Sequence, residues 1–429
     1  MSLRGITTFL LWQTLFTSSF AAELPGDAPI TEQAAVEMTV RNNPGLAEMQ
    51  TRAIAAAAIP SQAGTLPDPV LSFNAMNLPT NTFSLSQEPM TQLQIGLSQA
   101  IPFPGKLALR EEAAQHEAEA VSNSVEELRL TLVRDVKSTW WQLFYLDRAL
   151  DIVRLNQDLL RQFVKIAETK YKVGQGLQQD VLLAQVELSR LLDLEIQLTG
   201  ARRNEAARFN ALVNRSGNRP VIIPREIINQ LPEIPSEDKL YQLAEKARPL
   251  LAQQRSRIDA ARSRLDLAEK NYYPDFNLNA GYGFRTGNNT NGSARADFAS
   301  LGVAMNLPIY AERKLNKAVD QRNAELLGQT YTLQDTWLQV QRAITAAHAD
   351  FEQAREQVSL FNTGIVPQSR QTVASMLAGY QVNKVDFLNL VRAQLNLYNY
   401  ETQYWKALAA ANQALAKLAA AVGKETINE

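Results

Sequence analysis

Two long stretches of the chain carry apolar residues at alternating steps of three and four positions. They span about residues 104–172 and 313–380, and this heptad spacing is typical of helices that pack along their whole length. At about 1.5 Å per residue, each helix would be on the order of 100 Å long. No compact soluble domain needs such a rod, so we expect each helix to bury its apolar stripe against lateral neighbours. Pro367 falls inside the second stretch and should kink that helix or end it locally.

Four shorter stretches alternate apolar and polar residues one by one, which is the pattern of half-buried strands. They span about residues 69–77, 92–101, 275–284 and 299–307. In a globular protein the apolar face would meet a core, whereas in an outer membrane it would meet lipid, and propensity alone does not separate the two. The apolar positions that we expect on this face are Leu71, Phe73, Leu93, Ile95, Leu97, Phe276, Leu278, Leu301 and Val303.

A turn motif follows each long helix. Residues 171–188 and 380–397 share Tyr, Val, Ala, Gln and Leu at constant spacing, and each copy leads into a return helix, about 178–214 and 387–422. Each copy therefore predicts the turn of a helical hairpin. The first copy has Gly174 and Gly176 where such a turn needs a permissive backbone.

The second copy of the motif has lost both glycines. Asn383 and Val385 stand in their places, and Asn tolerates left-handed conformations. The two copies belong to two larger repeats, 22–215 and 237–429, which show the same order of predicted elements. Residues 216–236 are rich in proline and predict a linker, the equatorial region of the molecule.

The first residues, 1–21, predict a signal peptide. Arg4 precedes a mostly apolar run, and Ser19-Phe20-Ala21 fits a small-x-small cleavage site. No later stretch approaches the roughly 18 apolar residues of a transmembrane helix. We therefore expect an exported protein whose membrane span, if it has one, is made of strands.

Composition excludes several classes of function. The chain of 429 residues has 43 basic and 44 acidic side chains, and this near-zero net charge argues against nucleic acid as a partner. It has no cysteine, which excludes disulfides, thiolate metal sites, cysteine nucleophiles and a lipid-modified N-terminal cysteine. His116 and His348 are isolated, and Gly174-x-Gly176 lacks the third glycine of a nucleotide loop. We expect no enzyme, no cofactor and no metal site.

The number of strands per chain limits how a membrane barrel could be assembled. Four strands cannot close a membrane barrel without edges, so closure needs several copies: two would supply eight strands and three would supply twelve. A structural coiled-coil envelope protein is an alternative that explains the long helices. The four alternating strands disfavour it, because a tether does not need them.

The repeated hairpins, the strand pairs and the Tyr-x-Val-Gly…Asp…Ala-Gln motif resemble the TolC-type family of outer-membrane efflux ducts, over nearly the whole chain. The resemblance implies a mainly α-helical protein with a membrane β-barrel. Long hairpins form a trimeric α-barrel in the periplasm, and four strands per chain complete a twelve-stranded trimeric barrel in the outer membrane of a Gram-negative cell. The implied function is a passive conduit in a tripartite efflux system, which exports small solutes delivered by an inner-membrane pump.

In this family the hairpin tips meet a periplasmic adaptor protein, also called a membrane fusion protein. By resemblance, the tips span residues 172–180 and 381–389. The adaptor-docking residues would be Val173, Gly174, Gln175, Gly176, Val382, Asn383, Lys384 and Val385.

The resemblance also implies a periplasmic gate just past the second turn. Family members often carry acidic residues there, but this chain has Asn389 and Arg392, while Asp180 remains in the first repeat. A ring of Arg392 side chains would repel cations unless Asp180 pairs with it. The gate is therefore either acidic or set by Arg392.

The cargo is less constrained than the fold. Residues 77–107 resemble ducts that serve heavy-metal pumps of the resistance-nodulation-division type, which suggests heavy-metal cations as the exported solute. Drug efflux and type I protein secretion are the alternatives within the family. A duct need not bind what it passes, so the shortage of soft metal ligands does not decide between them.

Overall fold

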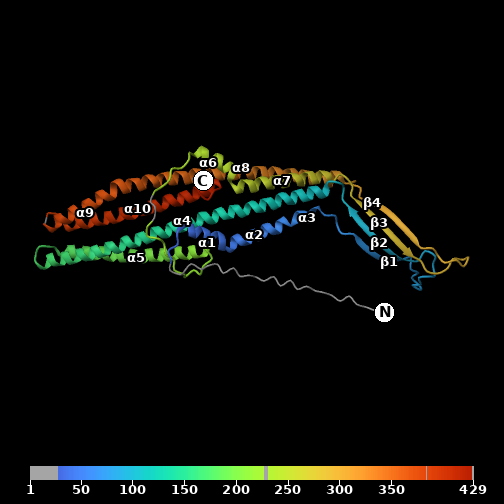
Figure 1. Ribbon diagram of the computed structural model, residues 1–429, viewed down its shortest axis with the longest axis horizontal. Helices are drawn as coiled ribbons and strands as arrows, with labels where there is room; N and C mark the ends of the chain where they lie inside the picture. The colour runs from blue at the N-terminus through green and yellow to red at the C-terminus, as the bar shows by residue number, and fades with distance from the viewer. Residues whose placement is uncertain (1–27, 227–229, 383, 428–429) are drawn as a thin grey trace.

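The computed structural model describes residues 28–226, 230–382 and 384–427, which form an elongated molecule with a sheet at one end (Figure 1). The predicted signal peptide lies outside the described residues. The first half contains α1 (Glu32–Asn42), α2 (Pro44–Ala57), α3 (Ile59–Gly64), β1 (Val70–Met76), β2 (Gln92–Ile101), α4 (Lys106–Lys172) and α5 (Gln178–Leu212). The second half contains α6 (Glu237–Ala247), α7 (Pro249–Lys270), β3 (Phe276–Phe284), β4 (Phe298–Met305), α8 (Ala311–Leu360), η1 (Phe361–Ile365), α9 (Val366–Gln381) and α10 (Phe387–Val422). Helices, a strand pair, a long helix and a return helix therefore occur twice in the same order.

The second long helix is interrupted, unlike α4. Residues Phe361–Ile365 form a π-helical turn between α8 and α9, and Pro367 follows in the first turn of α9. Proline lacks a backbone N–H and its ring crowds the preceding turn, so the regular helical ladder opens here. The helix expected over 313–380 is thus two α-helices joined by a π-helical turn, next to the proline that indicated a break.

Helix α4 is the central element of the helical part. Toward the sheet it packs against α2, α3 and α7, and toward the other end it packs against α5 and α10 (Figure 1). Helix α8 packs against α7 and α10, and α9 packs against α10. Each long helix therefore buries its apolar stripe laterally against neighbours, as the heptad spacing predicts. Among the described helices, none combines the length and the apolar character that crossing a membrane requires.

An aromatic cluster fixes α1 against the middle of α4. Trp140 and Phe144 are stacked, with ring centroids 5.9 Å apart, and Trp140 Nε1 donates to the Ile30 carbonyl at 2.8 Å. Phe209 of α5 and Leu408 of α10 join the same buried cluster. This cluster therefore ties α1, α4, α5 and α10 together at one level, and it marks the face of α4 that α1 covers.

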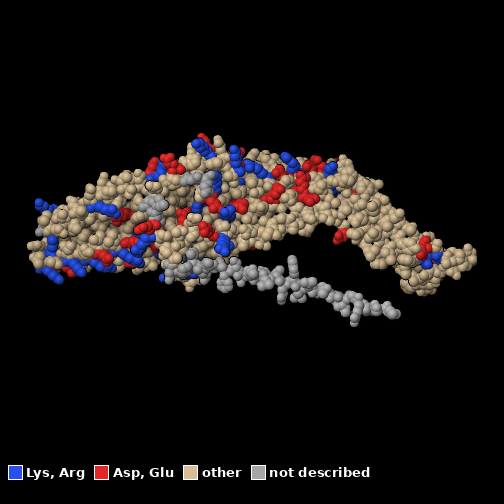
Figure 2. Space-filling model, viewed as in Figure 1, with Lys and Arg blue, Asp and Glu red and all other residues tan. Residues whose placement is uncertain are grey.

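The four strands form one antiparallel sheet in the order β1–β2–β3–β4, so β1 and β4 are its edges. The register aligns Leu71 with Leu97, Leu97 with Ala280, and Ala280 with Leu301. Few charged residues appear over the sheet in Figure 2, where they gather over the helices and at the far loops. The nine predicted apolar residues consequently share one face: Leu71, Phe73, Leu93, Ile95, Leu97, Phe276, Leu278, Leu301 and Val303.

The opposite face of the sheet carries small and polar side chains. A Cβ added to Gly281 would lie 2.5 Å from Gln94 Nε2, and one added to Gly96 would lie 2.7 Å from Ser72 Oγ. These glycines leave room for longer polar side chains to lie across neighbouring strands. The sheet is therefore apolar on one face and hydrophilic on the other, with no second layer packed on either face in the described chain.

A buried lysine joins the sheet to the helices. The Lys106 side chain is 2% exposed, and its Nζ donates to Asp275 Oδ1 at 2.8 Å and to the Tyr273 carbonyl at 2.9 Å. The Phe103 N–H donates to the same Asp275 oxygen at 2.8 Å, and the Phe103 and Tyr273 rings stack at 4.6 Å. Partial burial opposes ionisation of Asp275, but the Lys106 and Phe103 hydrogen bonds, with the charges of Lys106 and Arg110, outweigh it and lower the pKa of Asp275.

This pKa shift predicts acid sensitivity at the junction. A lowered pKa in the folded state stabilises the fold above the unfolded pKa of about 3.9, and this stabilisation is lost as the pH falls through the lower folded pKa. Asp275→Asn should therefore be less stable than the native chain at neutral pH but less destabilised by a fall to about pH 3. Thermal unfolding followed by circular dichroism at both pH values measures this, with exposed Asp68→Asn as control. Equal acid sensitivity of the native chain and Asp275→Asn would show that the pair contributes nothing.

Candidate functional site

The ends of the two helical hairpins lie side by side at the end of the molecule opposite the sheet (Figure 1). One buried cluster joins them, with Phe163 of α4 and Phe387 of α10 at a centroid distance of 6.4 Å. The other buried members are Leu160, Ala167, Val181, Ala184, Leu191, Tyr380, Leu390 and Val391. The fold therefore brings the two copies of the turn motif into one surface.

The first turn closes α4 with a glycine in the left-handed region. Gly174 has φ +72°, and no atom lies within 4 Å of a Cβ built on it. The Gln175 N–H donates to the Lys170 carbonyl at 2.8 Å, and the Gly174 N–H donates to the Tyr171 carbonyl at 3.0 Å. This is the usual way in which a helix C-terminus satisfies its last carbonyls. It leaves Val173 and Gln175 exposed at the tip.

The second turn repeats the closing hydrogen bond, since the Lys384 N–H donates to the Gly379 carbonyl at 2.9 Å. Asn383 lies outside the described residues, so its predicted docking role stays a prediction. In this turn a Cβ on Gly379 would lie 2.5 Å from Val385 Cγ2, whereas in the first turn a Cβ on Gly176 would lie 2.9 Å from Lys170 Cβ. Equivalent positions meet in the two turns, and each pair contains one glycine: Gly176 in the first turn and Gly379 in the second. Val385 can therefore replace a glycine, because its contact partner is itself a glycine.

Lys170 and Tyr380 connect the two hairpins just above the turns. Lys170 Nζ donates to the Tyr380 carbonyl at 2.7 Å and lies 4.2 Å from the Tyr380 ring centroid. The Tyr380 ring also lies 5.3 Å from that of Phe387. Burial, with the carboxylate of Asp180 as a second cause, raises the pKa of the Tyr380 phenol. The raised pKa keeps the Tyr380 phenol neutral, and its buried hydroxyl has no hydrogen-bond partner among the described residues.

The predicted gate residues occupy the first two turns of the return helices. Asp180 is half-buried in α5, while Asn389 and Arg392 are exposed on α10. Within the described part of one chain, Asp180 and Arg392 form no ion pair. The expected pairing is therefore not a contact within the chain, and only a contact between copies could supply it.

Sequence reasoning missed a buried polar contact above the tips. Gln394 Nε2 of α10 donates to Asn156 Oδ1 of α4 at 2.7 Å, and Asn156 Nδ2 donates to the Ile152 carbonyl at 2.8 Å. Gln394 is the recurring glutamine of the second turn motif, while its counterpart Gln185 is exposed. The recurrence of this glutamine in both turn motifs was the sequence feature that could have pointed to the contact. Among residues 28–226, 230–382 and 384–427, no group of three His, Cys, Asp or Glu side chains could hold a metal ion.

Comparison with known proteins gives one family and consistent relatives. The family described as outer membrane efflux protein matches residues 35–215 and 240–424. The cobalt-zinc-cadmium resistance protein CzcC of Cupriavidus metallidurans is 21% identical over 97% of this chain and 96% of its own length. The outer membrane protein TolC of Escherichia coli is 21% identical over 63% of this chain and 56% of its own length. The outer-membrane channel OprN has the same fold, with a TM-score of 0.77 at 17% identity over 91% of this chain and 89% of that structure.

Proposed function

The chain belongs to the family of outer membrane efflux proteins, and we propose that it works as a homotrimeric duct that carries small solutes through the outer membrane. In this proposal the helical part extends into the periplasm. Its hairpin tips receive solutes from an inner-membrane pump through a periplasmic adaptor. The family is one of efflux ducts rather than of enzymes, which supports this proposal.

The main support for this proposal is the four-stranded sheet. It has an apolar face without a covering layer, a hydrophilic face, and two unpaired edges, β1 and β4. Pairing β1 of one copy with β4 of the next would satisfy these edges, and three copies would close a barrel of twelve strands. Leu301 is 89% exposed and Phe73 is 71% exposed in the single chain. In the barrel these side chains would meet lipid, while the hydrophilic face would line the lumen.

The free sides of the helical part support the same assembly. Helix α5 exposes Leu182, Val186 and Ile196 in the half of the molecule nearer the tips, and α8 exposes Leu327 and Tyr331 in the half nearer the sheet. In a ring of three copies neighbouring chains would cover these apolar side chains at both levels, and the hairpins would form an α-barrel. A structural coiled-coil envelope protein would also use such helices, but it would leave the two-faced sheet without a role.

The proposal for the exported solute rests on the name of one relative. CzcC is named for cobalt, zinc and cadmium resistance, which favours heavy-metal cations as the exported solute. Drug efflux and type I protein secretion are the competing cargoes. Growth of a deletion strain on a panel of metals and drugs tests this choice. Selective sensitivity to divalent metals supports metal export, and unchanged growth on every metal contradicts it.

The gate gives a separate prediction. Three Arg392 side chains crowded by threefold symmetry within about 10 Å would repel one another unless carboxylates lie between them, and Asp180 of a neighbouring copy is the candidate. Arg392→Ala or Asp180→Ala should therefore loosen the closed state and raise single-channel conductance in planar bilayers. If the two residues act as a pair, the double variant should be no leakier than the sum of the two single variants. Unchanged conductance and ion selectivity in all three variants would place the constriction elsewhere.

A further inference from the structure

A row of charged side chains from α4, α7 and α8 lies in two adjoining grooves in the half of the molecule nearer the sheet, and α2 and α3 also line the larger groove. The grooves have volumes of about 340 and 660 Å³. Alanine and other apolar side chains, such as Ala114, form most of the lining of the larger groove, whereas the smaller groove is lined mainly by charged and polar side chains around Ala261. The charged residues that line them are Arg110, Glu117, Arg257, Arg264, Arg322 and Glu325.

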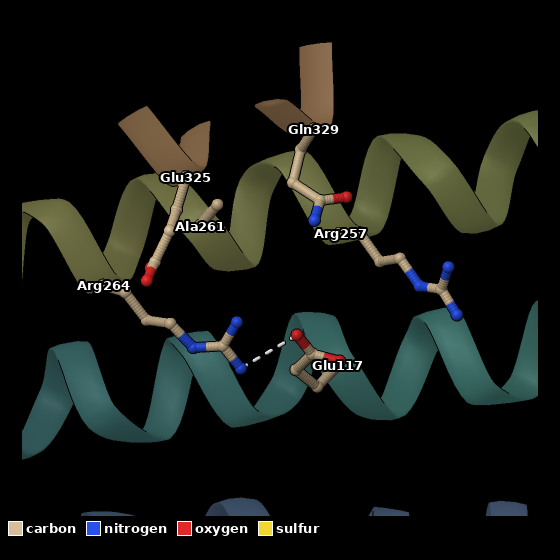
Figure 3. Close-up of a pocket in the computed structure, with 6 residues that line it drawn as sticks. All are labelled: Glu117, Arg257, Ala261, Arg264, Glu325 and Gln329. Carbon is tan, nitrogen blue, oxygen red and sulfur yellow. Dashed lines mark ion pairs between the residues drawn. The ribbon is translucent and has the colours of Figure 1, made fainter. Parts of the chain in front are cut away.

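The charged side chains that line these grooves are four arginines and two glutamates, so positive charge is in excess. Arg264 Nη2 lies 2.8 Å from Glu117 Oε1, and Figure 3 shows Arg264 of α7 reaching toward Glu117 of α4. Arg322 Nη1 lies 2.6 Å from Glu325 Oε2, so both carboxylates already have an arginine partner. Arg110 and Arg257 form no ion pair in the described chain, which leaves two guanidinium groups free to act on a solute.

Helical geometry places the grooves on one face of the layer. At about 100° per residue, Arg110 and Glu117 point to the face of α4 opposite Lys137 and Trp140. Lys137 and Trp140 contact the α1 segment, because Trp140 Nε1 donates to the Ile30 carbonyl and Lys137 Nζ lies 4.0 Å from Glu32 Oε1. The grooves therefore face away from α1.

The orientation of side chains on α7 also indicates which way the grooves face. Arg255 Nη2 donates to the Glu245 carbonyl of α6 at 3.0 Å, so this side of α7 faces α6. Arg257 lies two residues further on and points to the opposite side, together with Arg264. One face of the helix layer is thus covered by α1 and α6, and the other carries the arginine-rich grooves. If the layer closes into a tube, the covered face must lie outside, because the added helices would otherwise obstruct the lumen.

We propose that Arg110, Arg257, Arg264 and Arg322 form a lumen-facing ring that binds small anions in transit and makes the open duct favour anions over cations. The proposal rests on the trimeric duct proposed above and not on the metal cargo, because a lumen that favours anions would oppose the passage of free metal cations. Each arginine would be present three times around the lumen, and a lumen with one sign of charge concentrates the opposite ion. Guanidinium groups also match carboxylate and phosphate oxygens in pairs, so solutes with these groups are the class that the ring would hold best.

The reversal potential of single ducts in planar bilayers under a potassium chloride gradient tests the ring. Arg257→Glu and Arg110→Glu should each lower the chloride-to-potassium permeability ratio, by about sevenfold for each kT of change in the lumen potential, because anion and cation concentrations shift in opposite directions. Arg255→Glu makes the same charge change on the same helix but faces α6, and it should leave the ratio unchanged. The comparison is repeated in Arg392→Ala, where the tip no longer contributes its own arginine.

The outcomes separate the two proposals. If neither the native chain nor Arg392→Ala forms a conducting species in bilayers, the duct itself is contradicted. If it conducts and the ratio does not respond to Arg257→Glu and Arg110→Glu in either background, only the arginine ring is overturned. An equal response to Arg255→Glu would also overturn it, since the effect would then not depend on the face of α7.

Discussion

Arginine introduced at Leu278 or Val303 should prevent the protein from assembling in the outer membrane. Both side chains lie on the apolar face of the sheet and are exposed in the single chain, Leu278 to 44% and Val303 to 70%. An arginine on the lipid face costs about 2–4 kcal/mol at the bilayer midplane, and threefold symmetry repeats that cost in every copy. The amount of trimer in outer-membrane fractions, compared with the total protein made, measures the effect.

The control variants lie on the opposite face of the same strands. Asn279 is next to Leu278 in β3 and points to the hydrophilic face, as does Gln94 in β2. Asn279→Arg and Gln94→Arg should assemble much more nearly like the native chain, because a water-filled lumen solvates the guanidinium group. If both sets of variants lose trimer equally, the assignment of the two faces is wrong.

Bulky substitution at the hairpin tips should abolish export while leaving the trimer intact. Gln175 and Lys384 are exposed at the two turns, and their side chains contribute nothing to the buried cluster beneath. Gln175→Trp or Lys384→Trp should therefore fold and insert normally but clash with an adaptor that meets the tips. Growth on the exported solute measures the loss of function, and the amount of outer-membrane trimer shows that assembly is unaffected.

Cysteine chemistry identifies the partner at the tips. The native chain has no cysteine, so Gln175→Cys and Lys384→Cys introduce the only thiols. Each should be crosslinked to the periplasmic adaptor in cells, whereas Thr199→Cys, exposed on α5 far along the helix from the turn, should give no such adduct. Absence of a periplasmic partner at both tip positions would contradict docking by these turns.

The periodicity of the sequence predicted the elements well, because it reports directly which face of a segment is apolar. The four antiparallel strands and the mainly helical fold are confirmed, and the nine apolar strand residues share one face. The turn motif predicted two hairpins, and the Schellman-like closure at Gly174 is of the kind that its glycines suggested. The family that the motif resembled is also confirmed.

Features that depend on packing between distant segments were not predictable in this way. The first turn has its glycine at Gly176, whereas the second has it at Gly379, on the opposite side of the same contact. Only the folded chain shows which residues meet across the turn, and the alignment of the two motifs alone suggested that the second turn had lost a glycine. The burial of Lys106 depends on Asp275, which lies far away in the sequence. Periodicity also cannot tell which of two polar helix faces is covered by α1 and α6, so the arginine-rich grooves emerged only from the folded chain.

The mass of the detergent-solubilised protein tests the central claim most directly. The sheet of one chain has two open edges and an uncovered apolar face, so closure needs further copies, and the proposed barrel of twelve strands takes three. Mass measurement on protein extracted from outer-membrane fractions should give three chains, with no detectable monomer in the periplasmic fraction. A soluble monomer that retains full export activity would contradict the account.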